Sequence, residues 1–142
     1  MSDLKIKHIT PPEAWDIIQE NPEAVLIDVR SRMEYEYVGH PANAIHVAWQ
    51  EAPDWTVNPE FTHQVRKILA DRKETAIDIE ATPVLTICRS GKRSLAAAQA
   101  LTEDGFSTVY NIEQGFEGDL DGARHRSKIN GWRYHNLPWE QS

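Results

Sequence analysis

The sequence predicts an α/β domain. Two observations lead to this fold class. Short β-branched or aliphatic segments alternate along the chain with segments whose apolar residues recur at helical spacing, and capping signals stand in front of several helical segments. Neither an internal repeat nor a shift in composition divides the chain, and 142 residues are enough to build one hydrophobic core. We therefore expect residues 1–142 to form a single domain.

The N-terminal part predicts a strand followed by a helix. Leu4 and Ile6 suggest a short first strand that extends towards His8. Thr10 and Glu13 then have the spacing of a capping box, and a proline at the first helical position supports a helix that starts there. Apolar residues at positions 14, 15, 17 and 18 give this helix one face that can be buried.

The next segment repeats the alternation of strand and helix. Residues 24–29 are apolar enough for a buried strand. Ser31 and Glu34 form a second capping box, so a short helix is expected there, and Gly39 is expected to end it. Residues 44–47 are typical of a further strand.

The middle of the chain predicts a loop, a helix and a polar connection. Residues 49–58 contain turn-forming residues and are expected to form the loop. Asn58 is the expected cap of a helix that Pro59 opens and whose apolar residues recur at helical spacing. Residues 73–82 are mostly polar and connect this helix to the next strand.

The most informative stretch runs from a strand at residues 83–87 into an alanine-rich helix. Cys88, the only cysteine of the protein, follows the strand directly. Ser94 is expected to open the helix and Gly105 to end it. The loop between them contains Gly91, which permits a tight curl of the backbone. The pattern therefore places a thiol at the N-terminus of a helix.

The residues around Cys88 favour a negative charge on its sulfur. Backbone N–H groups at a helix N-terminus attract anions, and Arg89, Lys92 and Arg93 add positive charge. A lone cysteine is usually a small apolar core residue, and any one of these cations alone would indicate a solvated loop. Three cations directly after a cysteine at a strand end favour an anion-binding site instead, because unpaired cations are costly in a core.

The segment from Cys88 to Ser94 resembles the active-site loop of rhodanese-type sulfurtransferases. Further blocks match the family in order and spacing between about residues 9 and 116. They are Leu26-Ile27-Asp28-Val29-Arg30; Glu34-Tyr35 with Gly39-His40 and Ala44-Ile45; and Phe106 and Val109-Tyr110-Asn111-Ile112 with Gly115-Phe116. Two departures stand out: Pro41-Ala42-Asn43 replaces the usual Ile-Pro-Gly, and residues 117–130 form an insertion before the C-terminal tail.

The resemblance implies a rhodanese-like fold, with a central, mostly parallel sheet of about five strands flanked by helices on both faces. It also implies a thiosulfate sulfurtransferase-type enzyme, in which Cys88 accepts a sulfane sulfur as a persulfide and passes it to a thiol or to cyanide. Asp28 and Arg30, at the end of their own strand, are expected to form a supporting ion pair. No metal or cofactor is expected. The substrate-binding residues would be Arg89, Ser90, Gly91, Lys92, Arg93 and Ser94.

Two other functions stay open at this point. The chain could be a persulfide carrier or docking module that serves one dedicated partner. A cysteine-dependent phosphatase also holds a thiolate in an anion-binding loop, but its signature places five residues between the cysteine and an arginine. Here four residues separate Cys88 from Arg93, and Ser94 stands where that arginine would be. The phosphatase is therefore the weakest of the three functions.

The charge, the apolar content and the cysteine count of the chain limit the classes of partner that it can bind. The chain has 15 Lys and Arg against 22 Asp and Glu, a formal net charge of −7, which argues against nucleic-acid binding. We expect a cytoplasmic protein without membrane contact, because no apolar run approaches a membrane span and the N-terminus lacks an apolar signal region. A single cysteine leaves no second thiol to resolve a persulfide. Besides a small donor such as thiosulfate, we therefore expect an external acceptor: cyanide or a thiol, including one on a protein.

Residues 117–130 are polar, with only Leu120 and Ile129 as large apolar side chains. They follow the glycine turn at Gly115, which in the resembling fold lies beside the active-site loop. We expect a surface segment that borders the Cys88 pocket and influences which acceptor reaches the persulfide. A loop with no effect on the chemistry is the alternative.

Overall fold

The computed structural model describes residues 6–72 and 78–141 and has a parallel sheet at its centre. Five strands lie side by side in the order β1-β6-β5-β2-β4, and every neighbouring pair is parallel. The predicted α/β fold with about five parallel strands is confirmed. The bounds of the strands are β1 Ile6–Ile9, β2 Val25–Asp28, β4 Ile45–His46, β5 Val84–Ile87 and β6 Val109–Ile112.

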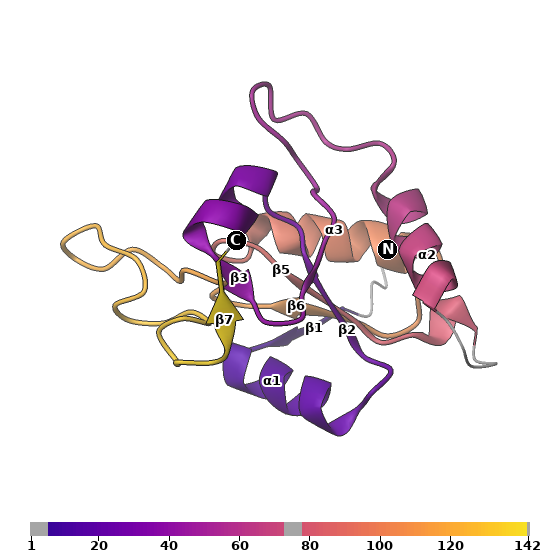
Figure 1. Ribbon diagram of the computed structural model, residues 1–142, viewed down its shortest axis with the longest axis horizontal. Coiled ribbons are helices and arrows are strands. Elements are labelled where there is room, and N and C mark those ends of the chain that lie inside the picture. The colour runs from indigo at the N-terminus through magenta and orange to yellow at the C-terminus, as the bar shows by residue number, and fades with distance from the viewer. Residues whose placement is uncertain (1–5, 73–77, 142) are drawn as a thin grey trace.

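Helices cover both faces of this sheet, as expected. Helix α1 (Pro11–Glu20) lies on one face, and helices α2 (Phe61–Arg72) and α3 (Lys92–Glu103) lie on the other (Figure 1). Because side chains alternate along a strand, neighbours in β2 enter different cores: Leu26 packs with α1, and Ile27 packs with α2 and α3. In the described part of the chain no helix is long and apolar enough to cross a membrane.

Helix α1 begins where the sequence predicts. Thr10 is its N-cap, and the Thr10 Oγ1 atom accepts a hydrogen bond from the Glu13 N–H at 3.3 Å. The Glu13 carboxylate in turn accepts one from the Thr10 N–H at 2.8 Å, which completes the capping box. The preceding strand β1 begins at Ile6 in the described residues, and Leu4 lies outside them.

The short helix predicted after β2 is a π-helix, η1 (Glu34–Val38). The second capping box is present: the Glu34 N–H donates to Ser31 Oγ at 3.3 Å, and the Ser31 N–H donates to Glu34 Oε1 at 3.1 Å. Gly39 follows with a φ of 111°, a conformation that favours glycine, and ends the helix. The chain then enters the two-residue strand β3 (His40–Pro41).

Residues 49–58 form the predicted loop, with an isolated bridge between Gln50 and Val57. Asn58 accepts a hydrogen bond from the Glu60 N–H at 3.0 Å, but α2 itself begins at Phe61, later than the predicted start at Pro59. Part of the predicted polar connection, residues 73–77, lies outside the described residues. Its last part contains the 3₁₀ helix η2 (Ile79–Ala81).

Helix α3 begins earlier than predicted, at Lys92 rather than at Ser94. Gly91 is the N-cap, and its φ of 119° turns the chain into the helix without a side-chain cap. Ser94 therefore lies inside the first turn, where it is fully buried. A serine near a helix start is usually a cap, which is why the sequence pattern misplaced the boundary. The helix ends at Glu103, just before Gly105, as expected.

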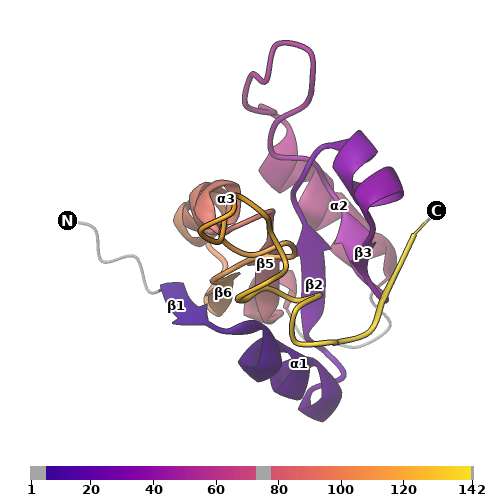
Figure 2. The same ribbon diagram turned by 90° about the vertical axis from the view of Figure 1, so that its left-hand side faces the viewer.

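The C-terminal residues return to the edge of the molecule near β3. Strand β7 (Trp139–Glu140) pairs antiparallel with β3, and Figure 2 shows this segment running alongside it. Trp132 is fully buried and meets Trp15 of α1 edge to face, with ring centroids 6.1 Å apart. Strands β3 and β7 were not predicted, because two residues are too few to show a periodicity.

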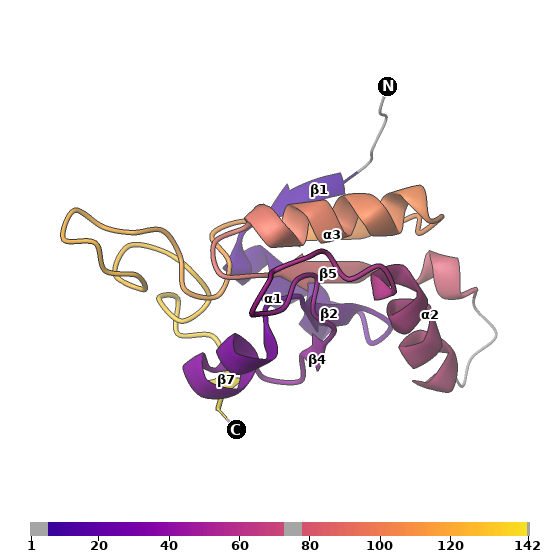
Figure 3. The same ribbon diagram turned by 90° about the horizontal axis from the view of Figure 1, so that it is seen from above.

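Residues 117–130 contain neither helix nor strand and extend away from the sheet (Figure 3). The two ends of the segment are held together. The Asp119 N–H donates to Asn130 Oδ1 at 2.8 Å, and Asn130 Nδ2 donates to Asp119 Oδ2 at 2.9 Å. Most side chains between these residues are exposed, which agrees with the expected surface segment.

Candidate active site

Cys88 lies directly after β5, at the carboxyl end of the sheet. In sheets of this kind, functional groups collect at that edge. The Cys88 Sγ atom accepts a hydrogen bond from the Gly91 N–H at 3.1 Å and lies 3.3 Å from Ser94 Oγ. The side chain is only 1% exposed. Gly91 and Ser94 are thus the groups that touch the sulfur: the Gly91 N–H donates to it, whereas the Ser94 hydroxyl accepts from the thiol.

The loop after Cys88 is held from behind by the glycine turn at Gly115. The Phe116 N–H donates to the Cys88 carbonyl at 2.8 Å, and the Glu117 N–H donates to the Arg89 carbonyl at 3.1 Å. A Cβ atom on Gly115 would lie 2.5 Å from both of these carbonyl oxygens, so only glycine allows the turn to approach this closely. The insertion therefore starts from a backbone that contacts the candidate loop.

Arg93, one of the three cations of the loop, is paired with Glu34 of η1. Its two terminal nitrogens donate to the Glu34 carboxylate at 2.7 and 2.9 Å. Burial acts to raise the pKa of Glu34, but the hydrogen bonds and charge of Arg93, together with hydrogen bonds from Ser31, outweigh it and lower the pKa from 4.5 to about 2. Arg93 therefore already has a carboxylate partner within the protein, although its charge also interacts with Cys88. That all three cations bind the substrate stays a prediction.

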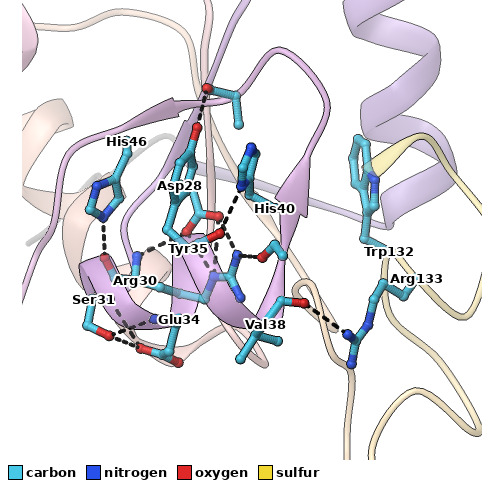
Figure 4. A network of polar contacts seen from close by, with 12 residues as sticks. Asp28, Arg30, Ser31, Glu34, Tyr35, Val38, His40, His46, Trp132 and Arg133 are labelled. Carbon is cyan, nitrogen blue, oxygen red and sulfur yellow. Dashed lines mark hydrogen bonds and ion pairs between the residues drawn. The ribbon is translucent and has the colours of Figure 1, made fainter. Parts of the chain in front are cut away.

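Asp28 and Arg30 form the expected supporting ion pair, and both are fully buried. Arg30 Nε donates to Asp28 Oδ1 at 2.9 Å, and Arg30 Nη2 donates to Asp28 Oδ2 at 2.6 Å (Figure 4). The same Nη2 atom donates to the Gly39 carbonyl at 2.5 Å, and the guanidinium lies 4.6 Å from the centroid of the Phe116 ring. The pair thus fixes the end of β2 to the end of η1.

Ser94 is held by polar residues that the sequence analysis did not single out. Its hydroxyl donates to Asn111 Oδ1 at 2.5 Å, and its carbonyl accepts from Thr86 Oγ1 at 2.9 Å. Thr86 and Asn111 face each other in register on β5 and β6. A buried threonine and a buried asparagine at matching positions of two mainly apolar strands are the signal that could have identified them.

An open groove of about 1320 Å³ lies beside the loop. Arg89, Arg93 and Glu117 line it on the side of Cys88, while exposed Met33 and Tyr37 contribute apolar surface from the η1 side. Lys92 is exposed as well, on the first turn of α3. Among residues 6–72 and 78–141, no three His, Cys, Asp or Glu side chains gather closely enough to hold a metal ion.

Comparisons with known sequences agree with this geometry. The model of the rhodanese-like domain family matches residues 10–120. An uncharacterised protein of Rickettsia conorii is 32% identical over an alignment that covers 96% of this chain and 99% of that protein. The thiosulfate sulfurtransferase GlpE of Actinobacillus pleuropneumoniae serotype 3 is 34% identical over 110 residues, which cover 78% of this chain and 82% of that enzyme.

Two solved structures extend the comparison. The crystal structure of Rv0390 from M. tuberculosis superposes on this protein with a TM-score of 0.79 at 39% identity. The match covers 96% of this chain and 98% of the Rv0390 chain. The solution structure of the polysulfide-sulfur transferase homodimer from Wolinella succinogenes has a TM-score of 0.58 at 25% identity, with coverage of 96% and 80%. Both matches extend well beyond residue 120, so similarity continues into the C-terminal part. The chain belongs to the rhodanese-like domain family, a family that includes sulfurtransferases.

Proposed function

We propose that this protein is a sulfurtransferase that moves a sulfane sulfur from thiosulfate or a related donor, through a persulfide on Cys88, to an external thiol or to cyanide. The observation that carries the proposal is the position of the only cysteine. It lies after β5, at the start of α3, with the Gly91 N–H 3.1 Å from its sulfur. The thiosulfate and polysulfide-sulfur transferases among the relatives support this class of donor.

In the first half-reaction, the Cys88 thiolate attacks the outer sulfur of thiosulfate. A new S–S bond forms to Cys88 Sγ while the S–S bond of thiosulfate breaks, and sulfite leaves with the electron pair of that bond. The Cys88 persulfide that remains carries its negative charge on the outer sulfur. Loop N–H groups, together with the exposed Arg89 and Lys92, supply the positive field for the dianionic donor.

In the second half-reaction, the acceptor attacks the outer sulfur of the persulfide. The S–S bond to Cys88 breaks, the Cys88 thiolate is released, and the product is thiocyanate from cyanide or a new persulfide from a thiol. The acceptor comes from outside because the chain has no second cysteine. The groove beside Arg89 gives acceptors larger than cyanide room to approach. A cytoplasmic setting would keep Cys88 reduced between cycles.

A phosphatase reaction has weaker support. Ser94 occupies the place of the arginine in the cysteine phosphatase signature, and it is buried against the Cys88 sulfur. The neighbouring Arg93 is bound to Glu34 at both terminal nitrogens, so its guanidinium is engaged within the protein rather than available to clamp a phosphate. The loop is therefore better suited to a sulfur atom than to a tetrahedral phosphate.

The test is thiosulfate-dependent release of thiocyanate from cyanide by the wild-type protein and by Cys88→Ser. We expect the wild type to turn over and the variant to release nothing above the uncatalysed background, because the nucleophile is gone. Serine is nearly the same size as cysteine, so an unchanged melting temperature would show that the fold is intact. Wild-type rates in Cys88→Ser would overturn the proposal. Loading of one sulfur per chain without turnover on any small acceptor would indicate a dedicated carrier instead.

A further inference from the structure

Three polar side chains connect Cys88 with the surface of the edge strand β1. Ser94 Oγ lies 3.3 Å from Cys88 Sγ and donates a 2.5 Å hydrogen bond to Asn111 Oδ1. Asn111 Nδ2 lies 3.3 Å from His8 Nδ1. Ser94 and Asn111 are buried, whereas His8 is exposed. The contacts therefore run from a buried thiol to an imidazole at the surface of the protein.

The sheet holds this connection in place. His8 and Thr86 are both in register with Asn111, so the three side chains form one polar row across β1, β6 and β5 beneath the first turn of α3. Thr86 Oγ1 fixes the backbone of Ser94 through its carbonyl at 2.9 Å. Polar groups inside a core need partners, and here each group in the row has one. The row thus fixes both the backbone and the hydroxyl of Ser94.

The Ser94 hydroxyl has only one proton to give. In the observed arrangement it donates to Asn111, so Ser94 can only accept a hydrogen bond from the Cys88 thiol. Once Cys88 loses its proton, an oxygen lone pair would face a thiolate. If the hydroxyl turned towards the sulfur instead, the buried Asn111 Oδ1 would lose its donor, which is unfavourable. The thiolate therefore needs a change further along the row.

We propose that His8 and Asn111 are positioning residues that act on Cys88 through the direction of the Ser94 hydroxyl; this inference rests on the proposed role of Cys88. When the Asn111 amide turns over, Nδ2 donates to Ser94 Oγ and Oδ1 accepts from a proton on His8 Nδ1. The Ser94 hydroxyl is then free to donate to the thiolate. The proton of Cys88 passes to solvent, and His8 obtains its Nδ1 proton from solvent, so no proton travels along the row.

The experiment measures the alkylation rate of Cys88 by iodoacetamide across a range of pH. The protein has one cysteine, so the signal comes from a single site, and no sulfur donor is needed. The variants are His8→Leu, which removes the donor, His8→Asn, which keeps an amide near the position of Nδ1, and Lys7→Leu. Lys7 is the exposed neighbour of His8 on β1 and serves as the matched control.

We expect His8→Leu to slow alkylation by about tenfold near neutral pH, the effect of losing one hydrogen bond to the buried row. At high pH the rates of the variants and the wild type should converge. His8→Asn should restore the wild-type profile, and Lys7→Leu should leave it unchanged. The charged groups around the loop are Arg89, Lys92 and Arg93, with Glu34 and Asp28 acting on Arg93, and all of them stay in place in these variants.

A wild-type profile in His8→Leu would overturn the inference. So would an equal slowing of all three variants, or a slowing of His8→Leu that persists at high pH, because either would show a structural effect without control of the Ser94 hydroxyl. In Asn111→Asp the carboxylate can accept hydrogen bonds but cannot donate one to Ser94, so this variant should slow alkylation more than His8→Leu. If Asn111→Asp fails to fold, the variants of the exposed His8 still test the inference. A profile that depends on His8 in a protein that transfers no sulfur would refute the proposed function alone.

Discussion

At the residue scale, the three cations that follow Cys88 have different surroundings. Arg93 lies against Glu34, 59 residues away in the sequence, whereas Arg89 and Lys92 face solvent. Cys88 and its basic loop could be identified from the local sequence pattern alone. The different surroundings of the three cations could not be predicted, because no local pattern reveals a partner on a distant helix. For the same reason, the hydrogen bond between Ser94 and Asn111 could not be predicted from the sequence.

This difference predicts separate effects for two alanine variants. Arg89→Ala should lower kcat/KM for thiosulfate by about tenfold or more with little change in melting temperature, because a charge-assisted contact with the donor is worth about 1.5–3 kcal/mol. Arg93→Ala, unlike Arg89→Ala, should lower the melting temperature, because it leaves the half-buried Glu34 without its partner. Arg72→Ala, at the exposed end of α2, is the matched control. Unchanged kcat/KM in Arg89→Ala would show that the basic loop serves another purpose.

The Glu34 pair also predicts how stability depends on pH. The pKa of Glu34 is about 2 in the folded protein, below its ordinary value of 4.5, so folding favours the charged carboxylate. Its contribution to the free energy of unfolding is complete above about pH 5 and is lost as the pH falls towards 2. Because solvent screens this partly exposed pair, the total is on the order of 1 to 3 kcal/mol. Urea unfolding at several pH values should therefore show the wild type approaching Glu34→Gln as the solution is acidified. A difference between the two proteins that is constant from pH 7 to pH 3 would contradict this role.

For individual helices and strands, sequence signals predicted the boundaries correctly where all the residues of the signal lie close together in the chain. The capping box of Thr10 and Glu13 fixed the start of α1, because both of its hydrogen bonds form within four consecutive residues. Helix α3 begins after Gly91 because of the backbone conformation of that residue. Gly91 has no side chain to cap the helix, so the capping pattern did not predict this start. Strands β3 and β7 form only by pairing with each other, and they lie far apart in the sequence. Neither could therefore be predicted from its own residues.

The segment 117–130 gives a prediction about acceptor choice. Its first residue, Glu117, lines the groove beside Arg89, and Gly118 and Gly131 approach so closely that a Cβ atom on Gly131 would lie 2.7 Å from the Gly118 nitrogen. Residues 119–130 can therefore be deleted by joining these two glycines. We expect sulfur transfer to cyanide to be kept and transfer to a protein thiol to change by a different factor, because only the larger acceptor would touch the segment.

The rates with the two acceptors are measured side by side on the same persulfide-loaded protein. Gly122→Ala is the matched control, since nothing lies within 4 Å of the added methyl group and the segment keeps its length. This control should leave both rates unchanged. Equal changes for cyanide and for the protein thiol in the deletion variant, or no change at all, would leave the segment without a role in acceptor choice.

At the scale of the whole molecule, alternating strands and helices were enough to predict the α/β class, and the family resemblance supplied the parallel sheet with helices on both faces. Strand order brings β5 to the centre of the sheet, between β6 and β2, so residues from three neighbouring strands surround the candidate loop. The C-terminal residues could not be placed from the sequence. Their anchor is Trp132, buried against Trp15 of α1, a contact between opposite ends of the chain.

Intact mass spectrometry can show whether the only cysteine carries the transferred sulfur. Incubation with thiosulfate should raise the mass of the wild-type protein by one sulfur atom, and subsequent cyanide should return it to the starting mass. Cys88→Ser should show no gain under the same conditions, and the buried sulfur position predicts a single addition per chain. A wild-type protein that gains no sulfur from thiosulfate or polysulfide, or an equal gain in Cys88→Ser, would show that Cys88 does not carry the transferred sulfur.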